Sequence, residues 1–588
     1  MYIHKWIIRN RKVDYKKMSQ QTGISEEICM ILVGRNITSK EDINMFLNPN
    51  LDKLYDPIKM KDIITATDIL IDKIKNNKKI RIISDYDVDG IISCYVLLDG
   101  LDELSANVDY VIPDRIKDGY GINDRIVKEA FNDGVDTIIT CDNGIAAVSQ
   151  VELAKKLGLT VIITDHHEVP FTIENENKLY CIPNADAIID PKQKDCNYPF
   201  KELCGAGVVF KLIQYLFERM NISSECCYEY LQYISIATVC DIVELNGENR
   251  IIVKNGIKSL NNTKNYGLKE LIRVNSIKDK EITSYTLGFI LGPCLNAAGR
   301  LDSANKAMEL LRAQTKEVAT VHAQELYELN MKRRAMTEEG FDKILDKIEN
   351  SHLKDDKVKI IYDDEVHESV VGIIAGRIKD KYNVPVIVLT KSKSGIKGSG
   401  RSIEIYNLYE ELSFCKDLLD KFGGHSMAAG LSIQENNIML LRDRLNEKFN
   451  ISEEELIPKI IIDVRLPIHL VNKEFVREIN LLEPFGKGNS KPIFGDKNVG
   501  IVMARIFGAK KNVLSLKLVS SNGDIVNGIF FGDINYFNKQ IIKQFGDEEL
   551  EKIYLGKTNK IKIDIAYFPR INFYKGNENL QIQINYIK

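Results

Sequence analysis

The sequence predicts an α/β protein with a parallel-sheet domain, a long connecting helix, a second, smaller α/β domain and a C-terminal β-barrel. Three observations predict this order. Between residues 76 and 250, short isoleucine-rich runs alternate with helical patterns, which favours a parallel sheet covered by helices. Residues 306–350 are charged and lack proline, as expected for an extended helix. After residue 453, short alternating runs recur at the spacing of a small barrel or sandwich.

The composition is that of an ordinary globular chain. Its 588 residues are 44% hydrophobic and carry a net charge of −3, and they suffice for three or four domains of roughly 150 residues. A net charge this small does not attract nucleic acid by itself. Binding to nucleic acid would therefore require local patches of positive charge. No apolar run approaches the roughly 20 residues of a membrane span, and no signal-peptide pattern is present. The 11 cysteines form no CxxC pair, so we expect reduced thiols, a cytoplasmic protein and no zinc site.

The N-terminal segment, residues 1–75, is predicted to be helical and irregular. Pro49 and Pro57 interrupt its helical patterns. No combination of its residues points to chemistry.

The predicted catalytic domain, residues 76–250, opens with a strand that leads into three aspartates. Asp85, Asp87 and Asp89 occupy alternate positions and are followed by Gly90. If strand geometry continued into the turn, its period of two would place all three carboxylates on one side. Neighbouring carboxylates raise one another's pKa unless a positive charge lies between them. A divalent cation is the simplest such charge.

Two other interpretations of this motif were weighed against a metal site. Asp-x-Asp-x-Asp-Gly also opens an EF-hand calcium loop, which requires a glutamate at its twelfth position. Counting from Asp85, that position is Val96, so a calcium loop is excluded. A solvated acidic turn explains the isolated motif as well as a metal does, and the choice depends on the rest of the chain.

Later apolar runs of this domain also end in polar side chains. They lead, in order, into Asp142-Asn143-Gly144, Asp165-His166-His167 and Asp190. In open α/β sheets, ligands bind outside the carboxyl ends of the strands. A single aspartate such as Asp190 is usually a helix N-cap or part of a turn, whereas adjacent histidines after an acid are rarer.

A metal site explains these acids better than coincidence does. Asp241 follows another apolar segment, residues 234–239, and so ends a comparable run. Mixed carboxylate and imidazole ligands suit Mn²⁺ or Mg²⁺ better than a metal that prefers thiolates. Four carboxylates are more than one cation needs. We therefore expect two ions, about 3.5–4 Å apart, as in enzymes that cleave phosphoryl groups.

The acidic and histidine segments together resemble the four motifs of the DHH phosphoesterase superfamily in order and spacing. The resemblance implies five metal-binding residues, which are Asp87, Asp89, Asp142, His166 and Asp241. It also implies that Asp142 bridges the two ions and that His167 faces the substrate phosphate. Asp85 and Asp165 would orient the ligands. Some relatives carry a histidine where this chain has Ile83, so we expect one ion to have fewer protein ligands.

The predicted helical connector, residues 251–355, contains one further candidate site. Asn296 and Arg300 lie in the stretch 292–300, just before the predicted long helix. Arg300 could form a surface ion pair, but an arginine behind asparagine and small residues also suits contact with phosphate. The stretch resembles a motif of the single-strand-specific DNA exonucleases within the DHH group.

The second α/β domain, residues 356–452, carries two glycine-rich stretches, 398–402 and 423–430, which are predicted to be turns. Glycines let backbone N–H groups approach an anion closely. Each stretch alone is a weak signal, but together they resemble the substrate-binding domain that accompanies DHH catalytic domains. Together with Arg115 of the first domain, the candidate substrate-binding residues of this domain are Ser399, Arg401 and His425.

The last domain, residues 453–588, is predicted to be an OB-fold that binds a single strand. Residues 451–588 hold 20 lysines and arginines against 16 aspartates and glutamates. Basic charge with aromatic side chains suits a barrel that stacks bases and follows phosphates. We expect about half of the aromatics to lie in the barrel core. These residues are Phe507, Phe530, Phe531, Tyr567, Phe568, Phe573 and Tyr574.

The resemblance implies a metal-dependent exonuclease that degrades single-stranded DNA in the 5′→3′ direction to mononucleotides, in DNA repair and recombination. Its cofactors would be two Mn²⁺ or Mg²⁺ ions, and its partners a helicase and a single-strand-binding protein. The polarity follows from the resemblance alone. One alternative is a DHH phosphatase or nanoRNase that acts on short oligonucleotides or small phosphodiesters. Another is a strand-binding protein with an inert catalytic lobe.

Overall fold

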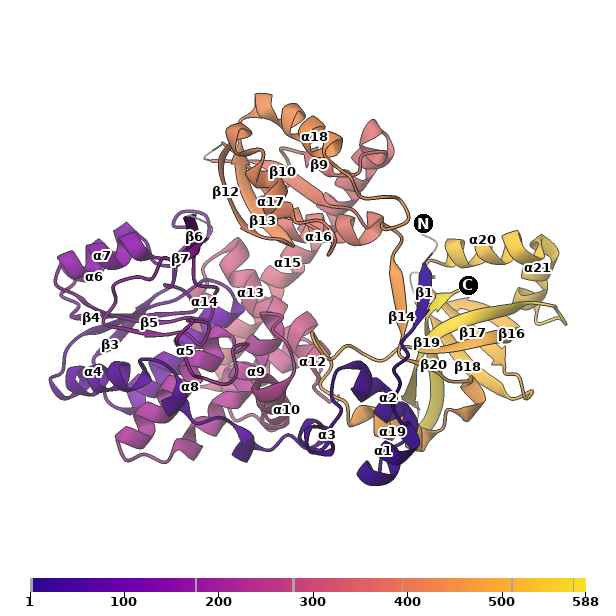
Figure 1. Ribbon diagram of the computed structural model, residues 1–588, viewed down its shortest axis with the longest axis horizontal. Helices are drawn as coiled ribbons and strands as arrows, with labels where there is room; N and C mark the ends of the chain where they lie inside the picture. Colours follow the sequence, from indigo (N-terminus) through magenta and orange to yellow (C-terminus); the bar gives the residue numbers. More distant parts are fainter. Residues whose placement is uncertain (1–3, 175–176, 278–280, 394, 509–510, 575) are drawn as a thin grey trace.

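The computed structural model describes residues 4–174, 177–277, 281–393, 395–508, 511–574 and 576–588. The chain forms a large catalytic lobe, a second α/β lobe and a C-terminal barrel, and a long helix runs between the first two (Figure 1). In the part of the chain that is described, no helix is long and apolar enough to cross a membrane.

The catalytic lobe is built on a parallel sheet with the strand order β3-β2-β4-β5-β8. The chain moves from β2 to one side, then returns past β2 to β4. In doubly wound sheets, the ligand crevice lies at this reversal, outside the carboxyl ends of the strands. The strands are β2 (Ile80–Ile83), β3 (Val108–Val111), β4 (Thr137–Cys141), β5 (Thr160–Thr164) and β8 (Ala187–Ile189).

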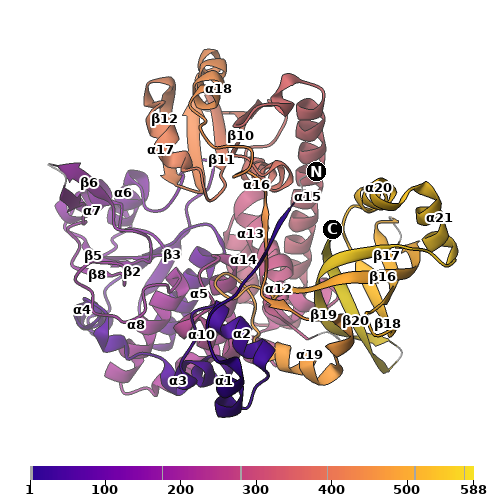
Figure 2. The same cartoon turned by 45° about the vertical axis from the view of Figure 1, so that its right-hand side comes forward.

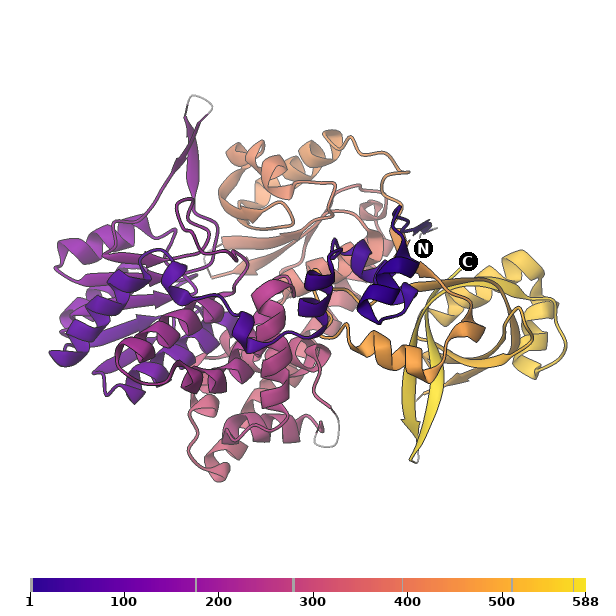
Figure 3. The same ribbon diagram turned by 60° about the horizontal axis from the view of Figure 1, so that its bottom comes forward.

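Helices cover both faces of this sheet, which is why its strands are apolar on both sides. Ile82 and its neighbours pack against one group of helices, and Ile83 and its neighbours pack against the other. The first group comprises α4 (Ile63–Lys75), α5 (Val88–Glu103) and α8 (Gly205–Arg219), and the second comprises α6 (Asp124–Asn132) and α7 (Val148–Lys156). A hairpin of β6 (Phe171–Glu174) and β7 (Asn177–Tyr180) projects from this lobe (Figure 3).

Strand geometry does not continue through the three aspartates. β2 ends at Ile83, and Asp87 is the N-cap of α5, where its Oδ1 accepts hydrogen bonds from the N–H groups of Asp89 and Gly90. Aspartate is a favoured N-cap residue, so the helix begins there. Gly90 is required because a Cβ at that position would lie 2.4 Å from the Asp85 carbonyl oxygen.

Helices connect the catalytic lobe to the second lobe (Figure 2). The single helix predicted over 306–350 is wrong, because the chain breaks it near residue 312. Thr315 caps the second part by accepting a hydrogen bond from the Val318 N–H. These helices are α9 (Leu231–Cys240), α10 (Gly247–Leu260), α11 (Tyr266–Val274), α12 (Ser284–Thr286), the π-helical turn η4 (Leu287–Leu291), α13 (Gly292–Leu301), α14 (Asn305–Leu311) and α15 (Lys316–Glu349).

The second lobe is a mixed sheet with the order β12-β13-β11-β10-β9. The first predicted glycine-rich turn is wrong, because it lies within strand β11 between β10 and β13. The second glycine-rich stretch does contain a turn, which lies between β12 and β13. The elements are β9 (Lys359–Tyr362), α16 (Val371–Tyr382), β10 (Val386–Ser392), β11 (Gly395–Arg401), α17 (Leu408–Ser413), β12 (Leu419–His425), β13 (Ala428–Ile433) and α18 (Ile438–Glu447).

The C-terminal sheet closes into a barrel, because β16 pairs with β17 on one side and with β19 on the other. Phe530, Tyr567 and Phe568 are buried in it, whereas Phe507, Phe531 and Phe573 are exposed, so the expected division of these aromatics is confirmed for those whose side chains are described. The elements are β14 (Lys459–Ile462), β15 (Val464–Arg465), α19 (Lys473–Asn480), β16 (Phe494–Phe507), β17 (Val513–Val519), β18 (Ile525–Phe530), α20 (Ile534–Phe545), α21 (Asp547–Leu555), β19 (Lys562–Tyr574) and β20 (Asn577–Ile587).

The N-terminal residues pack against this barrel. β1 (Lys5–Ile8) pairs in parallel with β14, so the segment predicted to be helical and irregular also contributes a strand. Helices α1 (Tyr15–Thr22), α2 (Glu26–Gly34) and α3 (Lys40–Leu47) follow. Ile28 and Phe46 of these helices belong to one hydrophobic cluster with Phe494 and Tyr567 of the barrel.

Arg250 of α10 joins these N- and C-terminal parts to the catalytic lobe. Its Nε donates a hydrogen bond to the Phe46 carbonyl oxygen at 2.6 Å, and the guanidinium lies 3.7 Å from the Phe46 ring centroid. Its Nη1 and Nη2 donate to the carbonyl oxygens of residues 481–484. We call this set of contacts the Arg250 junction.

Candidate active site

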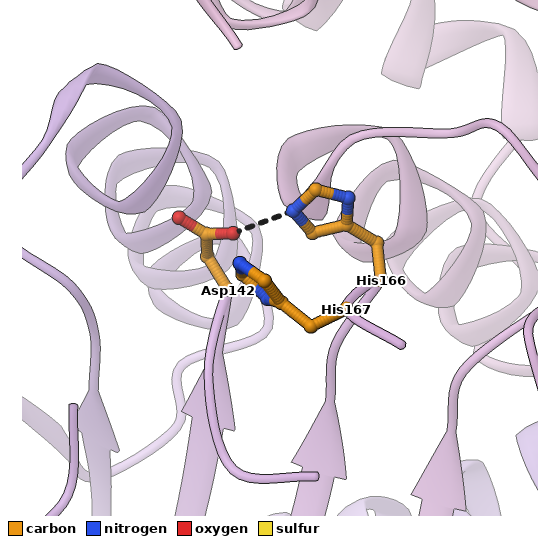
Figure 4. Close-up of side chains that lie close together, drawn as sticks. All are labelled: Asp142, His166 and His167. Carbon is orange, nitrogen blue, oxygen red and sulfur yellow. Dashed lines mark ion pairs between the residues drawn. The ribbon is translucent and has the colours of Figure 1, made fainter. Parts of the chain in front are cut away.

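Carboxylates and a histidine from distant segments converge at the carboxyl edge of the catalytic sheet. The Nε2 atom of His166 lies 3.0 Å from Asp142 Oδ1 (Figure 4), 3.7 Å from Asp89 Oδ2 and 3.8 Å from Asp241 Oδ2. Asp142 follows β4, His166 follows β5 and Asp241 ends α9. The acidic cluster, as we use the term below, comprises Asp85, Asp87, Asp89, Asp142, His166 and Asp241.

Local backbone contacts fix Asp142. Its φ is 61°, in the left-handed region that an aspartate tolerates better than most residues. The adjacent Asn143 donates hydrogen bonds to the carbonyl oxygens of Ile83 and Cys141, and so ties the end of β2 to that of β4. Gly205 is required nearby, because a Cβ there would lie 2.7 Å from the Asp142 Cβ.

Asp89 lies in the first turn of α5 and is buried. Its two carboxylate oxygens accept hydrogen bonds from the N–H groups of Gly205 at 2.6 Å and Ala206 at 2.9 Å. These N–H groups are at the start of α8, where the helix dipole favours negative charge. Burial and the nearby charge of Asp87 nevertheless raise the pKa of Asp89 to about 6.

The ring of His166 is oriented to offer a lone pair to a cation. The ring hydrogen-bonds the backbone of Leu203, and burial lowers the pKa of His166 to about 3, so the imidazole is neutral. Its Nε2 and the Asp142 Oδ1 are both buried without a hydrogen-bond partner in the described part of the chain. Two lone pairs 3.0 Å apart repel each other, and a cation between them removes the repulsion.

Burial and mutual repulsion raise the pKa values of the remaining carboxylates. Burial, followed by the charges of Asp89 and Asp87, raises the pKa of Asp142 well above its usual value. The same causes raise the pKa of Asp241 to about 8, and burial followed by the charge of Asp87 raises that of Asp85 to about 8. Clustered carboxylates with raised pKa values are what a divalent cation stabilises, so the residues present suit Mn²⁺ or Mg²⁺.

Asp142 contributes to two sets of candidate ligands. Within the described residues, three groups of three offer ligand atoms that all lie within 4.8 Å of one another. Asp85 is a member of one group, although the resemblance implies only an orienting role for it. The groups are Asp142 with His166 and His167, Asp89 with His166 and Asp241, and Asp85 with Asp87 and Asp142.

Asp165 holds His167 in its charged form. The Nδ1 of His167 lies 2.7 Å from Asp165 Oδ1, and Asp165 also accepts hydrogen bonds from the N–H groups of His166 and Ile145. Burial opposes the positive charge of His167, but the bond to Asp165 raises its pKa to about 9. The same pair lowers the pKa of Asp165 to about 2, against the effect of its burial.

Sequence reasoning missed Tyr120. Its hydroxyl donates to the Asp142 carbonyl oxygen at 3.0 Å and lies 3.3 Å from the ring nitrogens of His167. Its neighbours Gly119 and Gly121 have φ values of 80° and 67°, so the chain adopts a conformation that favours glycine on both sides. An aromatic residue between two such glycines was the available signal.

The predicted substrate-binding residues fall into two groups. Arg115 stacks over the Tyr86 ring at 4.2 Å, and the Nη1 of Arg300 donates to the Ser369 carbonyl oxygen at 3.1 Å, across to the second lobe. In that lobe, Arg401 donates a hydrogen bond to Ser399 Oγ at 2.9 Å. A Cβ atom added at Gly372 would lie at about that same distance from the Arg401 and Ser399 side chains. Arg300, Ser399 and Arg401 therefore lie around the segment that begins α16.

Asn296 and His425 are the remaining predicted residues, and Asn296 lies one turn before Arg300 on α13. Asn296 projects from α13 and has a buried Oδ1 with no hydrogen-bond partner in the described part of the chain. His425 lies at the exposed end of β12, and it makes no hydrogen bond or ion pair with the other predicted site residues, all of which are described. Its role in binding stays a prediction.

Three family descriptions match successive parts of the chain. Residues 79–238 match the DHH family, N-terminal domain, residues 355–450 match the DHHA1 domain, and residues 462–586 match the RecJ OB domain.

Curated relatives match most of the chain. The single-stranded-DNA-specific exonuclease RecJ of Bacillus subtilis is 37% identical over 89% of this chain, which spans 65% of that relative. RecJ of Escherichia coli is 32% identical, over 89% of each chain. RecJ of Salmonella typhimurium is 31% identical, over 90% of each chain.

Solved structures show the same fold. The crystal structure of RecJ in complex with Mn²⁺ from Thermus thermophilus superposes with a TM-score of 0.80 and 25% identity, over 99% of this chain and 79% of that one. A crystal structure of exonuclease RecJ bound to manganese matches with a TM-score of 0.58 and 29% identity, over 66% of this chain and 96% of that one.

Proposed function

The chain belongs to the RecJ family of the DHH phosphoesterases, and from this membership we propose that it is a metal-dependent exonuclease that degrades single-stranded DNA 5′→3′ to mononucleotides. Its role lies in DNA repair and recombination. The acidic cluster carries this proposal, because its buried carboxylates and His166 leave lone pairs that have no donor in the described chain and that suit a cation. The barrel after it favours a long single strand over a small phosphodiester.

Within the acidic cluster, five residues hold the metal and one of them is shared. Asp142 would be the ligand shared by the two ions, an assignment supported by its place in two of the candidate ligand groups. Asp165 and Asp85 orient their neighbours. The five metal-binding residues are Asp87, Asp89, Asp142, His166 and Asp241.

The chemistry is hydrolysis of the first phosphodiester bond. When bound, divalent cations supply Lewis acidity to the scissile phosphate and make hydroxide available near neutral pH. His167, held as a cation by Asp165, donates a hydrogen bond to a phosphate oxygen that gains charge in the transition state. The P–O3′ bond breaks, the 3′ oxygen takes a proton, and the remaining strand keeps a 5′ phosphate. Tyr120 restrains His167 and the Asp142 backbone.

The substrate phosphates are held from both lobes. Arg300 reaches from the catalytic lobe to Ser369, and Ser399 and Arg401 lie on the other side of that segment. Together with Arg115 they form a basic set that fits a terminal 5′ phosphate. A terminal phosphate held one nucleotide before the cleaved bond would account for mononucleotide products. A helicase that supplies unpaired ends and a single-strand-binding protein are the partners that this reaction needs.

Digestion of end-labelled strands tests the proposal. With Mn²⁺ present, a single strand labelled at the 5′ end should release its label first, as a mononucleotide, and a 3′ label should be released last. A blunt duplex of the same sequence is the control and should resist. Release of the 3′ label first, or of no mononucleotide, would contradict the proposed function.

A further inference from the structure

A cavity of about 510 Å³ adjoins the acidic cluster, and none of the predicted contacts explains its main lining. At one end it is lined by Val88 and Cys240, the direct neighbours of Asp87 and Asp241. Figures 1 and 2 show α12, which contributes to its wall, on the side of the catalytic lobe that faces the barrel. The cavity therefore extends from the metal-binding residues toward the barrel.

Two stacked aromatic rings stand in the wall of this cavity. Tyr285 and Phe289 have ring centroids 4.8 Å apart and planes inclined by only 20°. Their side chains are 59% and 64% exposed. Phe289 lies in the π-helical turn η4, a type of turn that occurs mostly at functional sites. An exposed, ordered aromatic pair beside an apolar cavity indicates a ligand with a flat apolar face.

Cations surround the same cavity. Arg333, Lys487 and Lys491 line it, in addition to Arg300, which is assigned above to the terminal 5′ phosphate. Arg333 donates to Asn330 Oδ1, and no carboxylate of the described chain lies within 4 Å of any of the four. Unpaired cations and aromatic rings together match a strand of nucleotides, which presents phosphates and bases in alternation.

The far end of the cavity is continuous with the barrel. Lys491 lies 5.4 Å from the ring centroid of Phe568 in β19, and Phe485 meets the same ring edge to face at 6.2 Å. The lining of the cavity therefore contacts the barrel at this end.

We propose that this cavity holds the unpaired bases on the 3′ side of the cleaved bond, and that a base stacks on the Tyr285–Phe289 pair. The inference rests on the proposed exonuclease function and adds positioning residues to it. Stacking accepts every base, so this contact is independent of sequence. A base inside a duplex is already stacked and paired, so the same contact selects for single strands.

Removal of the aromatic pair is the first test. In the double variant Y285A/F289A, we expect KM for a long single strand to rise about tenfold to hundredfold. Cleavage of the P–O3′ bond of 5′-phosphothymidine 3′-(p-nitrophenyl phosphate), which has no downstream base, should keep its kcat. F131A, which removes an exposed phenylalanine of α6, is the matched control and should change neither. An unchanged KM for the long strand overturns the inference, and so does an equal loss on the small ester.

Removal of the partner bases makes the test specific for stacking. A strand with abasic second and third nucleotides should raise KM for the parent protein as much as Y285A/F289A does. On that strand, the KM of Y285A/F289A should be little higher than that of the parent protein, because removing the rings and removing the bases abolish the same contact. If the effects of the variant and of the abasic strand on KM are additive, the inference is overturned, and an apolar peptide would remain as the occupant of the cavity. If the parent protein releases no nucleotide from the intact strand, the proposed function fails first, and the two failures are distinguishable.

The cations have a separate readout. R333Q should lower the slope of log KM against log salt by about one unit, as expected for one lost phosphate contact. K332Q changes the preceding residue of α15, which lies outside the cavity, and should leave the slope unchanged. Equal slopes for R333Q and the parent protein would overturn the assignment of Arg333 to a phosphate.

Discussion

Arg250 and Asp142 are both buried charged residues, 1% and 3% exposed, but protein atoms satisfy the first and leave the second without a partner. Every nitrogen of the Arg250 guanidinium donates to a backbone carbonyl oxygen. Asp142 Oδ1 has no hydrogen-bond donor in the described chain, and another lone pair, on His166 Nε2, lies 3.0 Å from it.

The difference separates a structural charge from a ligand-binding one. Burying a charge is unfavourable unless hydrogen bonds or an opposite charge replace water. In the Arg250 junction the protein itself supplies that replacement, so the charge holds three parts of the chain together. In the acidic cluster the replacement must come from outside the chain. The following predictions test this contrast.

The largest expected effect is on cleavage by D142A. Loss of the shared metal-binding residue should reduce kcat for single-strand digestion on the order of a thousandfold or more. Strand binding should persist, because the barrel and the cavity are unchanged, and gel-shift or anisotropy measurements would show this. Activity near that of the parent protein would contradict the bridging role.

The next largest effect is on stability and concerns the Arg250 junction. R250M leaves the carbonyl oxygens of residues 481–484 and Phe46 without donors, so the free energy of unfolding should fall by about 3 kcal/mol or more. Urea denaturation measures this. R219M, which removes an exposed arginine paired with Asp68, should have no measurable effect. If both variants unfold alike, the Arg250 junction does not stabilise the fold.

A smaller effect of opposite sign is expected for D142N in the absence of metal. The substitution removes one of several mutually repelling carboxylates, so the metal-free protein should gain about 1 kcal/mol and a few degrees in Tm. The rise in Tm on adding Mn²⁺ should shrink strongly, because a ligand is lost. D380N, an exposed change in the second lobe, should alter neither value. A destabilised D142N protein would show that the carboxylates do not repel.

The last prediction concerns the pH dependence of metal-free stability. The pKa of Asp89 is raised to about 6, and those of Asp85 and Asp241 to about 8, above the unfolded value near 3.9. The folded protein thus holds these protons more tightly, and its stability should fall as pH rises from about 4 to about 8. Saturating Mn²⁺ should flatten this slope when Tm is measured across that range. An equal slope with and without Mn²⁺ would argue against titration of the cluster.

The convergence of Asp142, Asp165 and His166 could be predicted from the sequence because it depends on a general property of parallel sheets. Strands that end in polar residues deliver them to the same edge, whatever the loops do. The path from β2 to Asp89 could not be predicted in the same way. A helix N-cap and a continued strand place Asp87 differently, and the sequence fits both.

Other features depended on contacts between distant residues. The glycines of β11 are needed because Leu389 and Leu408 fill the space where side chains would be, and no local pattern distinguishes this from a turn. The pairing of β1 with β14 and the packing of α2 against the barrel join residues more than 400 positions apart. The role of Tyr120 depends on the folded position of His167.

The shared core of the N-terminal helices and the barrel has a consequence for biosynthesis. The ribosome makes Ile28 and Phe46 long before Phe494 and Tyr567, against which they pack. At about 5–20 residues per second, the interval is on the order of 20–90 s. Throughout that time the apolar face of α2 and α3 has no partner, while the catalytic lobe can already fold. The nascent N-terminus is therefore the region that a chaperone would have to shield, and truncations from the C-terminal end would expose it permanently.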